Sequence, residues 1–255
     1  MRVYFIGAGP GAADLITVRG ARILAEVSVI LYAGSLVPEA LLTYCRKDAN
    51  IINTASLDLD AQVSVYIDAQ ERDVEVARLH SGDPSIYGAT SEQMRRLREL
   101  GIEYEVVPGV PSFAAAAASC ATELTKPGVS QTIILTRISG RASSVPESEA
   151  LTSLAQHRSS MCIFLSGPHL ATIVEQLASS YPPTTPIALV HRATWSDEKK
   201  HVSTLGKILD EVNPSQWALT TMVLVGDVLD EESGSDSRLY SAQYSHKFRR
   251  ASANV

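Results

Sequence analysis

Apolar positions in the first half of the chain follow two patterns that alternate along the sequence. Nearly continuous apolar runs at 2–6, 27–32, 74–79 and 104–107 are typical of strands buried on both faces of a parallel sheet. Between them, apolar residues recur every three or four positions at 17–25 and 59–72, which predicts amphipathic helices. This alternation predicts an α/β fold.

Two further helices are predicted beside glycines and prolines. One begins at Thr90, where Thr90 and Gln93 have the spacing of a capping box, and ends before Gly101, which suits a C-terminal cap. The other is the alanine-rich segment 114–118, whose N-terminus would present unpaired N–H groups beside Ser112.

The second half repeats the alternation of strands and helices. Strands are expected at 132–136, 161–165, 187–191 and 221–225, and helices at 146–156, 169–179 and 205–212. The polar Pro/Gly segment 124–128 is suited to a linker. We therefore expect an N-terminal α/β domain of residues 1–124 and a C-terminal α/β domain of residues 125–255, with a polar, loosely ordered tail from about residue 230.

The loop 7–11, Gly-Ala-Gly-Pro-Gly, follows the first strand and invites comparison with a dinucleotide fingerprint. Its third glycine comes one residue early, and no acidic residue follows the second strand, which ends in Ala33-Gly34-Ser35. A nicotinamide site is therefore disfavoured. A tight turn needed only for packing and a ligand-facing loop of another kind both remain open.

The loop Ser81-Gly82-Asp83-Pro84 follows the buried strand 74–79 and precedes a helix. Gly82 allows a ligand to approach the backbone, and Pro84 restricts the loop. Asp83 either contacts a ligand or caps the following turn. Because open α/β sheets bind ligands at the carboxyl ends of their strands, we expect a ligand site here.

Composition narrows the class of protein. The 255 residues include 45% hydrophobic side chains and carry a formal net charge of −6, which argues against general nucleic-acid or anionic-membrane binding. Cys45, Cys120 and Cys162 are far apart, so no disulfide framework or metal site is expected. No signal peptide and no apolar run of roughly 20 residues is evident, and we expect a cytoplasmic protein.

Several loops read together resemble the tetrapyrrole (corrin/porphyrin) methylases. The resemblance extends from Arg2 to about Arg250, and it rests on matching pieces at 3–11, 31–37, 81–88, 107–113, 135–141, 164–166, 191–198 and 203–205. It implies two α/β domains with a cofactor trough between them, a homodimer, and S-adenosylmethionine-dependent C-methylation of a tetrapyrrole. The cofactor contacts that it implies are Pro10, Ser81, Gly82, Asp83, Ile86, Tyr87, Pro111, Ser112, Leu165, Ala193 and Thr204.

Two positions depart from the family's pattern. Pro111 stands where other branches have a hydroxyl residue, so a hydrogen bond to the cofactor there would come from Ser112, and His191 stands where tyrosine is frequent. A tetrapyrrole carries many carboxylates, and Arg137 and Arg141 are the candidates to bind them, although either could be a solvated surface arginine.

Other roles stay open. Ser35 and Tyr87 are candidates for orienting the ring, and Trp195 either stacks on the macrocycle or, as the sequence favours, packs half-buried. No catalytic base is assigned. The sequence leaves open which ring carbon is methylated and whether the substrate carries cobalt. A protein that binds the ligand without turning it over also remains an alternative.

Overall fold

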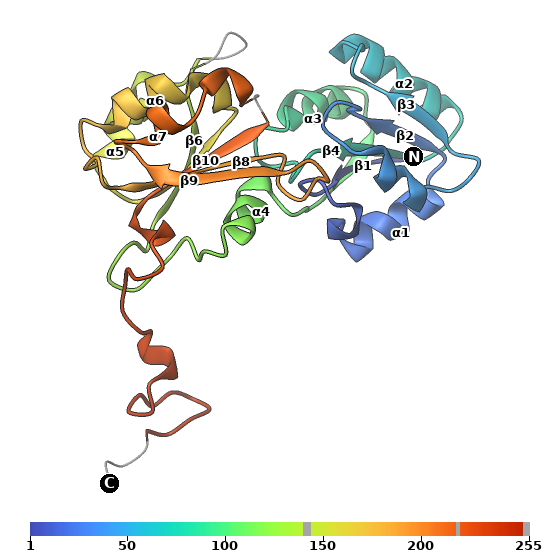
Figure 1. Cartoon of the computed structure of the whole chain (residues 1–255). Helices are drawn as coiled ribbons and strands as arrows, with labels where there is room; N and C mark the ends of the chain where they lie inside the picture. Colours follow the sequence, from blue (N-terminus) through green and yellow to red (C-terminus); the bar gives the residue numbers. More distant parts are fainter. Residues whose placement is uncertain (140–143, 218–219, 252–255) are drawn as a thin grey trace. The chain divides into compact units, whose positions relative to one another are not determined.

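The computed structural model describes residues 1–139, 144–217 and 220–251 (Figure 1). Their contacts separate unit 1, Met1–Ala115 with Arg192–Glu198, from unit 2, Ala116–His191 with Lys199–Val255. This division falls earlier than residue 124, where the sequence placed the boundary, and it assigns the segment 192–198 to unit 1.

Unit 1 contains a parallel five-stranded sheet in the order β3-β2-β4-β1-β5. The strands are β1 (Arg2–Gly7), β2 (Val29–Tyr32), β3 (Asn50–Asn53), β4 (Val76–His80) and β5 (Glu103–Val107). The α-helices are α1 (Val18–Glu26), α2 (Leu59–Glu71) and α3 (Thr90–Glu99), and short 3-10 helices lie at Ala13–Leu15 and Glu39–Tyr44. Helix α4 (Ser112–Ser119) begins in unit 1 and ends in unit 2.

Helices cover both faces of this sheet. Successive strand residues point to opposite faces, so each strand contributes side chains to the clusters on both sides. Ile6 and Leu79 pack with Leu24 of α1 in one cluster. Phe5 and Leu31 point the other way and belong to a second cluster with α2 and α3. A sheet buried on both faces explains why its central strands are nearly continuous in apolar residues.

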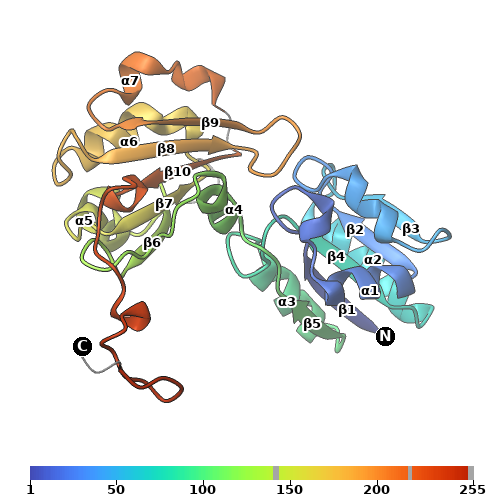
Figure 2. The ribbon, with the colours of Figure 1, turned by 60° about the horizontal axis from the view of Figure 1, so that its bottom comes forward.

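Unit 2 contains a mixed five-stranded sheet in the order β6-β7-β10-β8-β9 (Figure 2). The strands are β6 (Ile133–Arg137), β7 (Ser160–Phe164), β8 (Pro186–His191), β9 (Lys199–Thr204) and β10 (Thr221–Val225). Strands β6 and β7 are parallel, whereas β10 is antiparallel to β7 and β8, and β9 is antiparallel to β8. Its α-helices are α5 (Leu151–Ala155), α6 (Leu170–Leu177) and α7 (Ile208–Glu211), and 3-10 helices lie at Glu147–Glu149, Gly167–His169, Pro214–Gln216, Asp227–Leu229 and Arg238–Tyr240.

The structure adds two strands that the sequence did not predict. Strands β3 and β9 are edge strands without a fully buried residue, and three of the four residues of β3 and three of the six residues of β9 are exposed, so neither carries the apolar run of a buried strand. The prediction of a capping box at α3 is wrong, because Ala89 is the N-cap and no side chain caps the helix. The Thr90 hydroxyl donates instead to the Pro84 carbonyl, 3.0 Å away.

Within the described ranges no helix combines the length and apolar character needed to span a membrane. The tail after residue 230 contains the 3-10 helix Arg238–Tyr240 and a β-bridge between His246 and Arg249. Its Arg249 side chain donates to the carbonyls of Leu239 and Ser241.

Candidate functional site

The loops that follow β1 and β4 are joined by backbone hydrogen bonds at the carboxyl edge of the sheet. Ala8 donates to the His80 carbonyl at 2.8 Å, and Gly9 and Gly82 exchange two hydrogen bonds of 3.2 and 2.8 Å. Both glycines have a positive φ, +79° at Gly9 and +66° at Gly82, a conformation that other residues adopt at a cost. The first glycine-rich loop is therefore part of the same structure as the loop 81–88.

The loop after β5 contacts both of these loops. A Cβ built on Gly7 would lie 2.5 Å from the Gly109 Cα, and one built on Gly109 would lie 2.3 Å from the Gly82 carbonyl oxygen. Gly7 and Gly109 are thus glycines because the backbones of the three loops touch. Close packing, one of the two explanations left open for the loop 7–11, accounts for its first glycine.

The Asp83 carboxylate ties two of these loops together. Oδ1 accepts hydrogen bonds from the backbone N–H and the hydroxyl of Ser85, and Oδ2 accepts one from the Gly109 N–H at 2.8 Å. Partial burial raises the pKa of Asp83, but the hydrogen bonds from Ser85 and Gly109 outweigh it and leave the pKa below its ordinary value. Both oxygens are engaged within the protein, which supports the turn-capping role.

The segment 192–198 packs on the loop 9–12 within unit 1. Trp195 Nε1 donates to the Pro10 carbonyl at 2.8 Å, and Thr194 Oγ1 accepts from the Ala12 N–H at 2.9 Å. A Cβ on Gly11 would lie 2.2 Å from Trp195 Cδ1. The Arg192 guanidinium carbon lies over the indole ring of Trp195, 3.9 Å from the ring centroid. These contacts support the packing role of Trp195.

Five of the eight non-glycine residues with positive φ in the described ranges lie in or next to the loops that carry the family resemblance. They are Tyr87 (51°), Ala89 (49°), Leu165 (55°), Arg192 (51°) and Thr194 (71°), whereas Asp73, Ala121 and Arg158 lie elsewhere. Tyr87 and Leu165 also expose 49% and 45% of their surface. Strained backbone that presents apolar side chains to solvent is typical of a ligand site.

Buried polar side chains lie beneath the loop 81–89, and none of them was predicted as a site residue. Gln93 donates to the Ala89 carbonyl and accepts from Tyr66 of α2. Arg78 and His80 of β4 are only 7% and 5% exposed. Burial, and then the charge of Arg78, lower the pKa of His80 to about 3, although a backbone hydrogen bond with Gly88 acts to raise it. The available signal was a pair of polar residues at alternate positions of an otherwise apolar strand.

The structure separates the predicted site residues into two groups. Unit 1 holds Ser35 and the expected cofactor contacts Pro10, Ser81, Gly82, Asp83, Ile86, Tyr87, Pro111, Ser112 and Ala193. Gly82 approaches the 110–112 backbone, since an added Cβ would lie 3.6 Å from the Pro111 Cα and from the Ser112 nitrogen. Unit 2 holds Arg137, Leu165 and Thr204, and Arg141 lies outside the described residues.

Within unit 2, the strand register brings Arg137 and Leu165 to one edge but not Thr204. Arg137 is opposite Phe164, the residue before Leu165, and β8 ends at this same edge with His191, which is opposite Thr221. Thr204 is opposite Pro186 at the other end of β8, about 17 Å away at 3.3 Å per residue. Thr221, whose hydroxyl lies 3.1 Å from His191 Nδ1, lies at the edge that carries Leu165.

The described part of the chain holds no group of three or more His, Cys, Asp or Glu side chains arranged to bind a metal ion. What the arrangement offers is a cluster of loops at the carboxyl edge of a parallel sheet, rich in constrained backbone and poor in ionisable groups. Such a site suits a ligand held by backbone and apolar contacts.

Residues 2–209 match the tetrapyrrole (corrin/porphyrin) methylases, and the chain belongs to this family. A precorrin-4 C(11)-methyltransferase of Pseudomonas aeruginosa is 51% identical over 249 residues, which cover 98% of this chain and 99% of the relative. Among solved structures, a cobalt precorrin-4 methyltransferase of cobalamin biosynthesis is 40% identical and has a TM-score of 0.86 over 90% of this chain and 96% of its own. A uroporphyrin-III C-methyl transferase from Thermus thermophilus, complexed with S-adenosylhomocysteine, is 25% identical with a TM-score of 0.75, covering 93% and 97%. The family and the two α/β units expected from the sequence are confirmed.

Proposed function

We propose that the protein is an S-adenosylmethionine-dependent methyltransferase of cobalamin biosynthesis that methylates precorrin-4 at C-11 to give precorrin-5. The observation that supports this acceptor is the 51% identity with a precorrin-4 C(11)-methyltransferase over nearly the whole of both chains. A uroporphyrinogen III methylase is the weaker alternative, since a uroporphyrinogen-III C-methyltransferase of Priestia megaterium is 33% identical over 90% of this chain.

The loops of unit 1 fit S-adenosylmethionine. This cofactor supplies an electrophilic methyl group on a sulfonium, which is transferred to an electron-rich ring carbon. A sulfonium keeps its reactivity where it is aligned but weakly solvated, and the loop 81–88 offers constrained backbone with Ile86 and Tyr87. The N-terminus of α4 presents N–H groups at Ser112, where Pro111 has none. Asp83, engaged with Gly109 and Ser85, holds the shape of the loop.

Gly82 provides the test of the cofactor site, and Gly101 provides its matched control. Both have φ of +66°, and a Cβ on Gly101 would meet no atom within 4 Å. Gly82→Val and Gly101→Val therefore impose the same backbone strain, but only Gly82→Val should abolish binding of S-adenosylhomocysteine in calorimetry. Gly82→Asn, whose residue tolerates this φ, adds the side chain with less strain and should also weaken binding. Retained affinity in both Gly82 variants would refute the site.

Arg137, at the end of β6, is proposed to bind a substrate carboxylate, and Ser35, after β2, is proposed to orient the ring. Arg137→Ala should raise KM for the tetrapyrrole while leaving the affinity for S-adenosylhomocysteine unchanged. Equal losses of both affinities would make Arg137 a structural residue.

The reaction itself is tested by mass spectrometry. The protein is incubated with methyl-labelled S-adenosylmethionine in enzymatic mixtures that generate either precorrin-4 or its cobalt form. We expect one labelled methyl at C-11 of the metal-free substrate, and any cobalt would enter with the substrate. A label found only on the cobalt form would place the protein in the anaerobic route, and no transfer to either would overturn the acceptor.

We further propose that the protein acts as a homodimer in the cytoplasm, as the resemblance and the cysteine spacing led us to expect. Sedimentation velocity at micromolar concentration should give a single species of twice the 27.4 kDa chain mass. A monomer at that concentration would contradict the proposed assembly.

A further inference from the structure

Gln93 of α3 is bound at both ends of its amide although it is only 4% exposed. Its Oε1 accepts from the Tyr66 hydroxyl at 3.0 Å, and its Nε2 donates to the Ala89 carbonyl at 3.2 Å. Tyr66 lies on α2 and is fully buried. Because the Ala89 carbonyl can only accept, it takes the amide NH2 of Gln93, and the Tyr66 hydroxyl then supplies the donor that the buried Oε1 needs.

Ala89 is the last residue of the loop that begins at Ser81, and it is held in the left-handed region with φ of 49°. An alanine in this conformation persists only where its surroundings enforce it. Two side chains of α3 supply that constraint: Gln93 binds the Ala89 carbonyl, and Thr90 binds the Pro84 carbonyl. The Tyr66 hydroxyl is linked to the loop by its hydrogen bond to Gln93.

We propose that Tyr66 and Gln93 are positioning residues that hold the loop 81–89 in the conformation that binds S-adenosylmethionine. The inference rests on the proposed cofactor role of this loop. Without the Tyr66 hydroxyl, the buried Oε1 of Gln93 has lost its donor, and side-chain conformations that break the bond to Ala89 compete with the present one. The loop then spends part of its time in a conformation with lower affinity, and the apparent dissociation constant rises by the inverse of the fraction that keeps the binding conformation.

The test is a double-mutant cycle read by calorimetry with S-adenosylhomocysteine. Tyr66→Phe and Gln93→Met should each raise Kd by about three- to tenfold, the range that one buried hydrogen bond contributes. The double variant should bind about as tightly as Gln93→Met alone, because the Tyr66 hydroxyl has already lost its hydrogen-bond acceptor once the amide is gone.

Tyr181→Phe is the matched control. Tyr181 is also a buried tyrosine whose hydroxyl donates one hydrogen bond, to the Ser159 carbonyl at 2.6 Å, but it lies in the core of unit 2. Its removal should cost similar stability and leave Kd within about twofold of the unmodified protein.

Two further readouts separate positioning from a loss of folded protein. In Tyr66→Phe without ligand, backbone amides of 82–89 should exchange hydrogen faster than in Tyr181→Phe. In turnover, KM for S-adenosylmethionine should rise while kcat at saturating cofactor stays within about twofold. A lower kcat with unchanged KM would mean fewer active molecules and would overturn the inference.

The failures are distinguishable. If the unmodified protein does not bind S-adenosylhomocysteine, the proposed function fails and the inference fails with it. If it binds, but Tyr66→Phe behaves like Tyr181→Phe, or if the losses in the double variant simply add, the inference alone is wrong.

Discussion

Asp83 stabilises the site loops through hydrogen bonds that only its ionised form accepts in full. Its carboxylate receives the N–H groups of Ser85 and Gly109, and the net result is a lowered pKa. A group whose pKa is lower in the folded state contributes stability above its ordinary pKa, and this contribution is lost as the pH falls through the folded value.

Asp83→Asn should therefore destabilise the protein by about 1 kcal/mol near neutral pH, since one acceptor is replaced by a donor and solvent screens part of the loss. The difference from the unmodified protein should shrink as the pH falls below the ordinary aspartate value of 3.8. Urea unfolding midpoints from pH 3 to 7 measure it. Asp68→Asn, on the exposed face of α2, is the control, and a difference that does not change with pH would contradict this account.

Gly11 is required by two adjacent side chains far away in the sequence, since a Cβ would lie within 3.0 Å of both Thr194 and Trp195. Trp195 occupies the space that a Cβ would take, at 2.2 Å from Cδ1. Gly11→Ala should push the indole away from the Pro10 carbonyl and cost about 1 to 3 kcal/mol, the usual range for overpacking.

Fluorescence can follow this change, because the chain has two tryptophans and Trp217→Phe leaves Trp195 as the only emitter. In that background Gly11→Ala should shift the emission to the red, and Gly101→Ala, where no atom lies within 4 Å of the new Cβ, should not. An unchanged spectrum in Gly11→Ala would show that the loop relaxes without moving Trp195.

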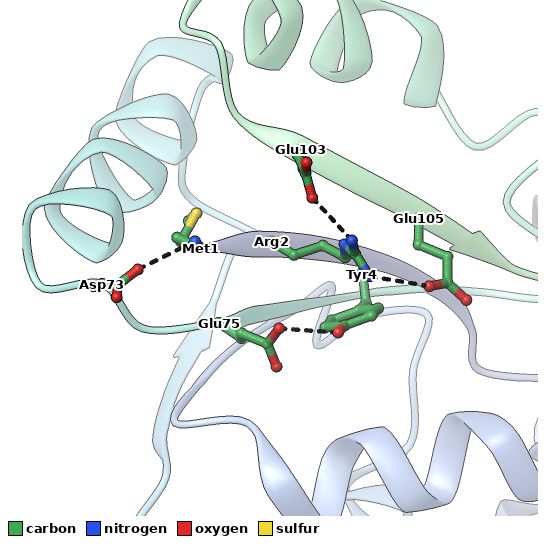
Figure 3. Close-up of polar contacts among 7 residues, drawn as sticks. All are labelled: Met1, Arg2, Tyr4, Asp73, Glu75, Glu103 and Glu105. Atoms are coloured by element: carbon green, nitrogen blue, oxygen red, sulfur yellow. Dashed lines mark hydrogen bonds and ion pairs between the residues drawn. The ribbon is translucent and has the colours of Figure 1, made fainter.

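At the scale of elements, charged side chains lie along the amino edge of the unit 1 sheet, whereas the site loops lie at its carboxyl edge. Figure 3 shows Met1 paired with Asp73, Arg2 paired with Glu103 and Glu105 of β5, and Tyr4 bonded to Glu75. The hydrogen bond and charge of Arg2 lower the pKa of Glu103. The side chains of Arg2, Glu103 and Glu105 are 41%, 72% and 36% exposed, so solvent screens their ion pairs and the pairing of β1 with β5 depends mainly on buried residues such as Val3.

Arg2→Met should consequently change Tm by less than about 3 °C, and the change should vanish in 1 M salt. Val3→Ala, on the same strand but fully buried, should lower Tm more and do so at any salt concentration. Scanning calorimetry at two salt concentrations makes the comparison. A large, salt-independent loss in Arg2→Met would assign the ion pairs a structural role.

Elements also show where sequence patterns stop being informative. The central strands β1, β2 and β4 were predicted because burial on both faces leaves a continuous apolar run. The edge strands β3 and β9 contain exposed and half-buried residues and no buried one, so they carry no such run. Thr90 and Gln93 had the spacing of a capping box, but their side chains donate to the Pro84 and Ala89 carbonyls instead of capping the helix.

At the scale of the whole molecule, unit 1 is not continuous in sequence. Its segment Arg192–Glu198 supplies Thr194 to the Ala12 N–H and Trp195 to the Pro10 carbonyl. A fragment of residues 1–124 would keep every strand of the first sheet and lose these two hydrogen bonds.

In such a fragment, the Ala12 amide should exchange hydrogen at least about tenfold faster than in the full chain, because its acceptor is absent. Amides of β1 and β4 are the internal control, and they should be affected less. Hydrogen exchange followed by mass spectrometry measures both. Equal protection of Ala12 in the fragment and in the full chain would show that the segment 192–198 contributes nothing to the loop 9–12.

The sequence by itself determined the α/β class, the central strands, most helices and the family, because each of these depends on short patterns read locally. Tertiary structure alone decided that Gly7 and Gly109 face each other's backbone, that Trp195 reaches Pro10 across 185 positions, and that Thr204 lies at the far end of β8 from His191. It also assigned Tyr66 and Gln93 to the loop carbonyls. These outcomes depend on which distant groups satisfy each buried polar atom, and that competition is settled only when the whole chain packs.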